Sequence, residues 1–213
     1  MSILVKVCGM TSTDDVALCR DLGADFLGFI FHPASPRNVT PGFAASAPAG
    51  PAKKVGVLVK QTLDETLALI DAARLDFVQL AGGQDEAFCA AVGRERVVKV
   101  FWPERYAAPA DLQADLERFA GLAAYHLLDA GSGGGGHGRG FDLGLIWSLA
   151  FPRPWLLAGG LSPETLPAAL SACRPAGVDL NSGVESAPGV KDADKLRRAF
   201  ALLAKAPRTK DQR

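Results

Sequence analysis

The feature that most constrains this chain is a regular alternation of short apolar runs with longer amphipathic stretches. Short, β-branched apolar runs are typical of buried strands, and apolar side chains that recur every three to four positions predict helices. Strands are expected at Ile3–Cys8, Phe26–Phe31, Lys53–Val59, Phe77–Leu80, Val97–Phe101, Ala124–Asp129, Trp155–Ala158 and Val178–Asn181. Helices are expected at Thr13–Leu22, Leu63–Ala73, Asp85–Val92, Ala110–Gly121, Leu143–Leu149, Pro163–Cys173 and Ala193–Ala204. A further segment, Thr40–Ala47, should form a short or irregular second helix, because Pro41 and Pro48 bracket it.

This order of strands and helices predicts a parallel sheet covered by helices. Eight strands with eight crossovers would close into a (β/α)8 TIM barrel, and a length of 213 residues lies near the lower limit for that fold. An open, doubly wound sheet is the alternative that the pattern leaves. Since no composition break or long linker divides the chain, we expect one barrel domain over residues 1–206 and a frayed tail over 207–213.

The composition argues against several classes of protein. Lysine plus arginine equals aspartate plus glutamate at 23 each, so no basic excess indicates a nucleic-acid partner. The four cysteines form no Cys-x-x-Cys pair and no histidine stands at zinc-like spacing, so neither a disulfide framework nor a metal site is expected. No apolar run approaches the ~18 residues of a membrane span, and the first residues lack the pattern of a secretory signal. A cytoplasmic protein without a membrane or nucleic-acid partner is the expectation.

Polar residues at the carboxyl ends of strands are the candidates for catalysis, because barrel enzymes carry their chemistry there. Lys6 and Cys8 share one face of the first strand, and Asp179 and Asn181 share one face of the last. Barrel closure makes these two strands neighbours, so the four side chains should cluster at the mouth. Asp129 ends the sixth strand and should look across the barrel toward Cys8. An acid that faces a thiol suits paired proton transfers on a small substrate.

Each of these residues also has a structural interpretation. A lone cysteine in a strand is usually a small buried hydrophobe, and Asp129 and Asp179 could belong to a plain ion-pair network. A free thiol with a pKa of ~8.5 is only ~3% thiolate at neutral pH, so we expect Lys6 to lower the pKa of Cys8 by stabilising the anion. His126 should face the side opposite to Asp129, toward the packing helices.

Three loops carry possible ligand contacts. Glycine-containing stretches follow the last two strands, at Ala158–Leu161 and Asn181–Glu185, where (β/α)8 barrels recurrently bind phosphate. Arg37, in a Ser-Pro-Arg turn after the second strand, could clamp a planar carboxylate, although an ordinary solvated arginine is the alternative. The run Gly131–Gly140 is interpreted as a mobile loop over the mouth, and a dinucleotide site is rejected there because no acidic residue follows at the required spacing.

The motifs just described recur together in one known family. The stretches are Lys6–Thr11, Gly28–Phe31 with Ser35–Arg37, Leu128–Asp129, Gly138 with Phe141–Asp142, Leu157–Leu161 and Asp179–Ser186. In content and order they resemble the signature stretches of the phosphoribosylanthranilate isomerases of tryptophan biosynthesis. The resemblance covers nearly the whole chain.

The resemblance implies an Amadori rearrangement of N-(5-phosphoribosyl)anthranilate to 1-(2-carboxyphenylamino)-1-deoxyribulose 5-phosphate. It implies Asp129 as the general acid, Cys8 as the general base and Arg37 as the ligand of the anthranilate carboxylate, with Asp179 orienting substrate hydroxyls or the bridging nitrogen. The phosphate would be held by backbone groups around Gly159, Gly160, Gly183 and Val184. No metal or organic cofactor is required. The expected ligand is a small phosphosugar, and the protein is expected to be a monomer or a homodimer.

Two other functions remain open at this point. A related isomerase of an aminoaldose phosphate in the histidine pathway would keep the fold, but that family typically carries an aspartate where this chain has Cys8. A non-catalytic barrel that binds a phosphosugar or a partner is suggested by Ala81, which stands where the resembled family usually has histidine. Binding of the anthranilate-bearing substrate without turnover would favour the non-catalytic barrel.

Overall fold

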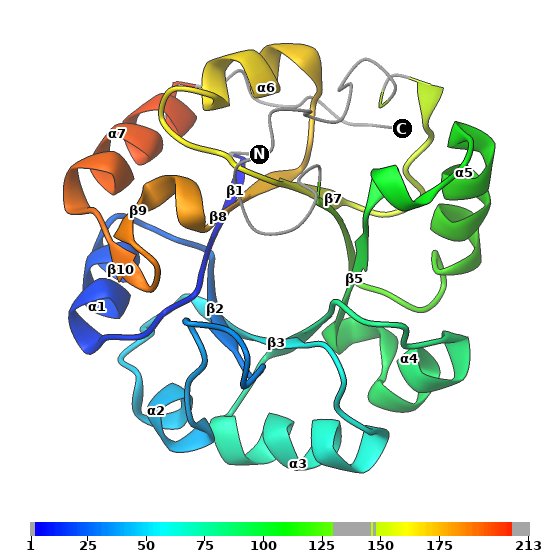
Figure 1. The fold of residues 1–213 in the computed structure, drawn as a ribbon, viewed down its shortest axis with the longest axis horizontal. Helices are drawn as coiled ribbons and strands as arrows, with labels where there is room; N and C mark the ends of the chain where they lie inside the picture. The colour runs from blue at the N-terminus through cyan, green and yellow to red at the C-terminus, as the bar shows by residue number, and fades with distance from the viewer. Residues whose placement is uncertain (1–2, 130–145, 147, 206–213) are drawn as a thin grey trace.

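In a computed structural model, which describes residues 3–129, 146 and 148–205, eight parallel strands pair in sequence order and close into a barrel (Figure 1). The strands are β1 Leu4–Cys8, β2 Phe26–Ile30, β3 Lys53–Leu58, β4 Phe77–Leu80, β5 Val97–Phe101, β6 Tyr125–Asp129, β7 Trp155–Ala158 and β8 Gly177–Leu180. The barrel closes through the parallel pairing of β1 with β8. The predicted (β/α)8 barrel is therefore confirmed, and the open sheet is excluded.

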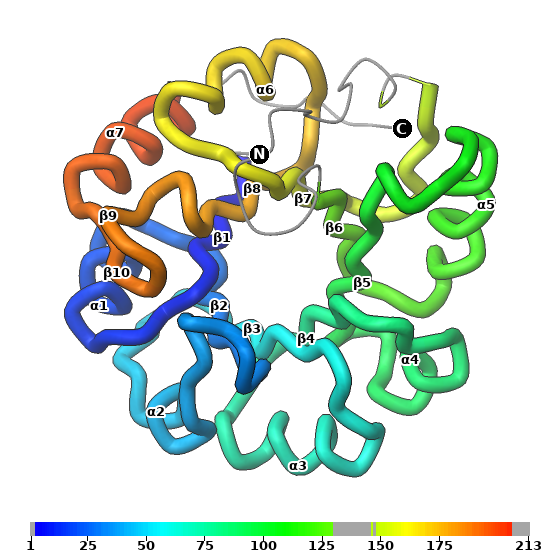
Figure 2. Tube along the Cα trace, viewed as in Figure 1, coloured from blue at the N-terminus to red at the C-terminus, as the bar shows by residue number. Residues whose placement is uncertain are grey.

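Helices surround this ring of strands on the outside (Figures 1 and 2). They are α1 Thr13–Asp21, α2 Pro41–Ser46, α3 Leu63–Ala73, α4 Glu86–Val92, α5 Pro109–Arg118, α6 Leu166–Ala172 and α7 Ala193–Leu203. Short 3-10 turns η1 Arg94–Arg96, η2 Pro103–Arg105 and η4 Ser182–Val184 were not expected from the sequence. Nor was the small antiparallel hairpin of β9 Glu185–Ala187 and β10 Val190–Lys191, which lies between η4 and α7.

The second helix is as short as the prolines predicted. Thr40 caps it by accepting a hydrogen bond from the Phe43 backbone N–H, and Pro41 occupies the first turn, where its missing N–H costs nothing. The helix ends at Ser46, two residues before Pro48. At 6 residues, α2 is the shortest α-helix in the described part of the chain.

One helix begins later than predicted, and three of the expected segments lie wholly or mostly outside the described residues. The stretch after Ser162 forms a turn in which the Ser162 carbonyl accepts from Thr165 and Leu166, so α6 starts at Leu166 and not at Pro163. The expected loop Gly131–Gly140 and the tail 207–213 lie outside the described residues, and so does most of the expected helix Leu143–Leu149. The domain limits at 206 and 207 therefore stay a prediction.

Two apolar layers define which way each strand residue points. A small cluster inside the barrel contains Val98, Val100, Leu127, Leu156 and Ala158, with Leu4 packed against it. A much larger cluster fills the space between the strands and the helices. Since side chains alternate along a strand, residues in step with Leu4 on β1 and with Leu127 on β6 face the interior of the barrel.

His126 confirms this alternation on β6. Its imidazole is fully buried on the helix side, edge-on to the ring of Phe101 with the centroids 5.0 Å apart. Burial lowers the pKa of His126 to about 4, so the ring is neutral at neutral pH. It is a packing residue of the outer layer, as the sequence predicted.

This buried imidazole should make the fold sensitive to mild acid. An unfolded histidine takes up a proton as the pH falls below 6.5, whereas His126 in the folded state does so only near pH 4. Stability is therefore lost progressively between those two values, by roughly 2 kcal/mol between pH 7 and pH 5. Urea unfolding of the protein and of His126→Phe at both pH values measures this difference. Equal losses in the two proteins would show that another group is responsible.

Candidate active site

The closure of the barrel brings the polar residues of β1 and β8 together, as expected. Lys6 and Asp179 are paired in register, and both lie in step with inward-facing positions of their strands. The Lys6 ammonium contacts both carboxylate oxygens of Asp179, at 2.9 and 3.0 Å, and both side chains are almost fully buried. Such a charge-assisted pair is stable in a buried setting only because each partner neutralises the other.

Cys8 lies beside this ion pair at the carboxyl end of β1. It is in register with Gly28 of β2, and a Cβ atom placed on Gly28 would lie 2.7 Å from the Cys8 sulfur and 3.1 Å from Lys6 Nζ. The missing side chain of Gly28 therefore leaves the room that the thiol and the ammonium occupy. Cys8 as a whole is 4% exposed.

The electrostatics of Cys8 differ from what its sequence neighbour suggested. Burial raises the pKa of Cys8 above its ordinary value, and the nearby Lys6 ammonium opposes this rise without reversing it. The Asp179 carboxylate adds to the rise. The predicted effect of Lys6 is thus confirmed, since Lys6 lowers the pKa of Cys8, but the net pKa is still raised because desolvation outweighs a single neighbouring charge that is itself paired.

Lys6 keeps its charge in this setting. Burial alone would lower its pKa, but the Asp179 carboxylate and the Cys8 sulfur together outweigh burial, and the pKa of Lys6 is raised. The site thus combines a lasting ammonium with a thiol whose ionised form depends on that ammonium. The positive charge of Lys6 favours the thiolate of Cys8, which is the form of the sulfur that can accept a proton.

Asp129 ends β6 and is half-buried, in register with Ala158 of β7. It lies in step with Leu127, on the inward-facing side of its strand. β6 and β1 lie on opposite sides of the ring (Figure 2). The fold therefore sets this carboxyl across the barrel from the strand that carries Cys8, as the sequence predicted.

Arg37 is held by a residue to which the sequence reasoning gave no role. Its Nε donates to Oε1 of Glu185 at 2.8 Å and its Nη2 donates to Oε2 at 2.5 Å. The ammonium of Lys191 contacts the same carboxylate at 2.8 Å and also donates to the Asn181 side chain at 3.1 Å. The Arg37 side chain is only 17% exposed, so it is not a freely solvated loop residue. No local signal could have shown this pair, because 148 positions separate its members.

The two glycine turns expected to bind phosphate contact each other. Gly159 and Gly160 follow β7 with φ of 106° and 63°, conformations that favour glycine. Gly183 packs so closely on the other turn that an added Cβ would lie 2.7 Å from the Leu161 carbonyl carbon. Val184, the next residue along the chain, is fully buried. The structure brings these four backbone positions to one region next to the β7 and β8 ends.

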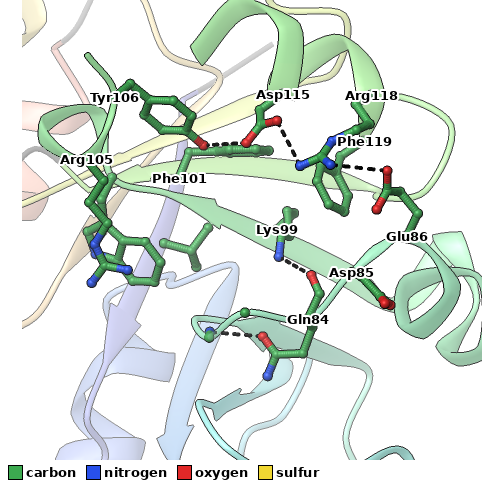
Figure 3. A pocket seen from close by; sticks show the side chains of 14 residues that line it. Gln84, Asp85, Glu86, Lys99, Phe101, Arg105, Tyr106, Asp115, Arg118 and Phe119 are labelled. Carbon is green, nitrogen blue, oxygen red and sulfur yellow. Dashed lines mark hydrogen bonds and ion pairs between the residues drawn. The ribbon is translucent and has the colours of Figure 1, made fainter. Parts of the chain in front are cut away.

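A separate cavity of about 410 Å³ lies outside the barrel, between α4 and α5 (Figure 3). The Lys99 ammonium reaches into it and donates to the Gln84 carbonyl at 2.6 Å. Arg118 bridges Glu86 at 3.3 Å and Asp115 at 2.8 Å across its wall. Arg118 is thus paired with two carboxylates, Lys99 is bound by a backbone carbonyl, and the Arg105 guanidinium lies over the Trp102 ring at 3.9 Å, so neighbouring groups already engage these three cations.

Two features are absent from residues 3–129, 146 and 148–205: a metal-binding cluster and a membrane-spanning helix. No group of three or more His, Cys, Asp or Glu side chains there is arranged to hold a metal ion. Within the same part of the chain, no helix is long and apolar enough to cross a membrane.

Comparison with known proteins agrees with this geometry. Residues 5–201 match the family model described as N-(5'-phosphoribosyl)anthranilate (PRA) isomerase. An N-(5'-phosphoribosyl)anthranilate isomerase of Maridesulfovibrio salexigens is 55% identical over 203 residues, which cover 95% of this chain and 99% of that protein.

Solved structures give the same result. The phosphoribosyl anthranilate isomerase of Thermus thermophilus superposes with a TM-score of 0.81 at 39% identity, over 95% of this chain and 98% of that one. A phosphoribosyl anthranilate isomerase in complex with reduced 1-(o-carboxyphenylamino)-1-deoxyribulose 5-phosphate superposes with a TM-score of 0.80 at 30% identity and the same coverage. On its sequence, its barrel and its relatives, this chain belongs to the N-(5'-phosphoribosyl)anthranilate isomerase family.

Proposed function

We propose that Cys8 and Asp129 carry out the two proton transfers by which this aldose–ketose isomerase converts its substrate in tryptophan biosynthesis. The substrate is N-(5'-phosphoribosyl)anthranilate and the product is 1-(2-carboxyphenylamino)-1-deoxyribulose 5-phosphate. The observation that carries the proposal is the placement of a thiol and a carboxyl at inward-facing strand ends on opposite sides of one barrel mouth. The family membership favours this reaction over the histidine-pathway isomerisation.

The reaction begins with acid catalysis at the furanose ring. The Asp129 carboxyl gives its proton to the ring oxygen, the bond between that oxygen and C1 breaks, and the anthranilate nitrogen supplies the electron pair that forms a protonated Schiff base. A C–H bond next to an iminium is acidic. The Cys8 thiolate removes the C2 proton, and the electron pair of that bond forms the C1–C2 double bond of an enolamine. A proton then adds to C1, and the C2 hydroxyl gives up its proton as its oxygen forms the carbonyl of the ketone, so protons gained and lost by the substrate balance.

Lys6 supports the base in this scheme. Burial raises the pKa of the Cys8 thiol and so favours its protonated form, whereas only the anion can accept the C2 proton. The ammonium of Lys6, anchored by Asp179, is the cation that favours this anion. The Asp179 carboxylate, which contacts Lys6, orients substrate hydroxyls or the bridging nitrogen in this scheme.

The anionic ends of the substrate bind away from the reacting carbons. The backbone around Gly159, Gly160, Gly183 and Val184 receives the phosphate, which is supported by the contact between the two turns and by the left-handed glycines. Arg37 receives the anthranilate carboxylate. No metal or organic cofactor enters any step.

The test of this function is turnover, followed by the fluorescence of the anthranilate group when N-(5'-phosphoribosyl)anthranilate is added to the purified protein. Conversion to the ketose should follow saturation kinetics. Binding without conversion would instead support the non-catalytic phosphosugar-binding barrel.

Replacing Arg37 should weaken substrate binding more than it slows turnover. Arg37→Ala removes a charge-assisted pair of hydrogen bonds, so KM should rise roughly 10- to 100-fold while kcat changes by less than about threefold. Arg37→Lys should recover only part of the loss, because an ammonium lacks the planar fork. Steady-state kinetics of the three proteins measure both constants. An unchanged KM in Arg37→Ala would remove the carboxylate contact from the proposal.

We also infer that the protein works in the cytoplasm, as a monomer or a homodimer. All four cysteines are free in the structure, although each is buried, and unpaired thiols suit a reducing compartment. Light scattering of the purified protein decides between one and two copies.

A further inference from the structure

We propose that Glu185 is a positioning residue for substrate recognition, because it holds one edge of the Arg37 guanidinium and so presents the other edge to the anthranilate carboxylate. This inference rests on the proposed role of Arg37 and adds a residue to it. Glu185 does not touch the substrate in this scheme, and it acts only through Arg37.

The chemistry of the guanidinium allows two carboxylates at once. One fork is formed by Nε and Nη2 and a second by Nη1 and Nη2, and each can receive a carboxylate in bidentate fashion. Glu185 occupies the first fork through bonds of 2.8 and 2.5 Å. Within the described part of the chain, Nη1 makes no hydrogen bond, so the second fork remains for a ligand.

Glu185 is itself fixed from several sides. Lys191 Nζ contacts its Oε1 at 2.8 Å, and Lys195 Nζ donates to its backbone oxygen at 2.7 Å. The side chains of Glu185 and Lys191 are 3% and 0% exposed, so neither can swing away into water. A guanidinium bound to so rigid a partner loses little freedom when a second carboxylate arrives, and this lowers the entropic cost of binding.

The charge of the cluster points to the same ligand. Arg37 and Lys191 contribute two positive charges and Glu185 one negative charge, so the three groups carry a net single positive charge. The Arg37 and Lys191 contacts hold the pKa of Glu185 below its usual range against the effect of burial, so Glu185 is a carboxylate at neutral pH. One further monovalent carboxylate would neutralise these three side chains.

Glu185 also connects the two anion-binding regions. It follows η4 directly, and η4 contains Gly183 and Val184 of the proposed phosphate turn. The hairpin that Glu185 begins packs against the Arg37 turn, since a Cβ on Gly189 would lie 3.3 Å from the Pro36 carbonyl oxygen. The short segment from Gly183 to Glu185 therefore fixes the distance between the carboxylate contact and the phosphate contact. This distance selects a substrate whose two anionic ends are separated by the same amount.

The experiment compares Glu185→Gln with the unaltered protein on two substrates. One is N-(5'-phosphoribosyl)anthranilate and the other is the same molecule built on aniline, which lacks the carboxylate. Glu185→Gln keeps the shape but removes the charge that orients Arg37. KM for the natural substrate should rise about tenfold with kcat within about threefold, and KM for the aniline analogue should not change. Glu86→Gln, which breaks an ion pair on the outer cavity, is the matched control and should leave both constants unchanged.

The double variant separates this inference from the proposed function. In an Arg37→Ala background, Glu185→Gln should add no further rise in KM, because the two residues act as a unit. If Arg37→Ala raises KM while Glu185→Gln does not, Glu185 is not a positioning residue and the Arg37 contact stands. If Arg37→Ala has no effect, the Arg37 contact itself is wrong. A KM rise of equal size on both substrates would mean a merely structural role and overturn the inference.

Should Glu185→Gln fail to fold, Lys191→Met tests the same idea from the other side of the carboxylate. It frees Glu185 to move while leaving its charge, so it should raise KM for the natural substrate only, by a smaller factor. An unchanged KM for the natural substrate in this variant would equally overturn the inference.

Discussion

Cys8→Ser should lower kcat by roughly two to four orders of magnitude, the usual scale for a lost general base. A serine hydroxyl ionises far less readily than a thiol, and the burial that raises the pKa of Cys8 would act on the hydroxyl as well. The substitution keeps the volume nearly unchanged beside Gly28, so substrate binding and KM should be little affected. Steady-state kinetics by anthranilate fluorescence measure both constants.

A matched control separates the chemistry of Cys8 from the general effect of losing a buried sulfur. Cys173 is also buried, and its Sγ donates to the Ala169 carbonyl at 3.2 Å, a bond that a serine can keep. Cys173→Ser should therefore retain near-normal turnover. If Cys8→Ser also did so, the sulfur would have no part in proton removal.

Asp129→Asn should reduce kcat by a similar factor, roughly two to four orders of magnitude, because an amide cannot give the proton that opens the furanose ring. Its shape at the end of β6 is nearly that of aspartic acid, so the strand and its register with β7 should persist. Asp115→Asn is the control, since Asp115 accepts a hydrogen bond from Tyr106 on the outer cavity, away from the barrel interior. Near-normal turnover of Asp129→Asn would remove Asp129 from the mechanism.

A deuterium label at C2 of the ribose distinguishes the two roles. In Cys8→Ser, C–H cleavage becomes rate-limiting, so the labelled substrate should react several times more slowly than the unlabelled one. In Asp129→Asn, ring opening precedes C–H cleavage and limits the rate, so the isotope effect should approach unity. The opposite pattern would exchange the assignments of acid and base.

The fold was predictable because its signals are local. Strands and helices can be recognised from short apolar runs and from apolar side chains that recur every three to four residues. Proline and capping residues mark the short second helix. Closure of the barrel then places Lys6 beside Asp179 without any further information. The start of α6 was misjudged because Ser162 and Pro163 are equally good signals for a turn and for a helix.

The parts of the site that escaped prediction depend on contacts distant in sequence or on burial. The pairing of Arg37 with Glu185 joins a loop after β2 to a hairpin after β8, and neither segment alone shows that the other is near. The pKa of Cys8 follows from how completely the barrel excludes water, a quantity that no spacing of residues encodes. The sign of such an effect needs the folded environment.

The Lys6–Asp179 pair spans 173 positions, and it has a consequence for biosynthesis. While the ribosome is still making the later strands, the lysine has no counterion, and a bare ammonium is too costly to enclose in an apolar environment. Catalytic competence should thus arise late and all at once, when the eighth strand seals the ring. Chains that end before the eighth strand should therefore be inactive and should not consume the phosphoribosyl substrate.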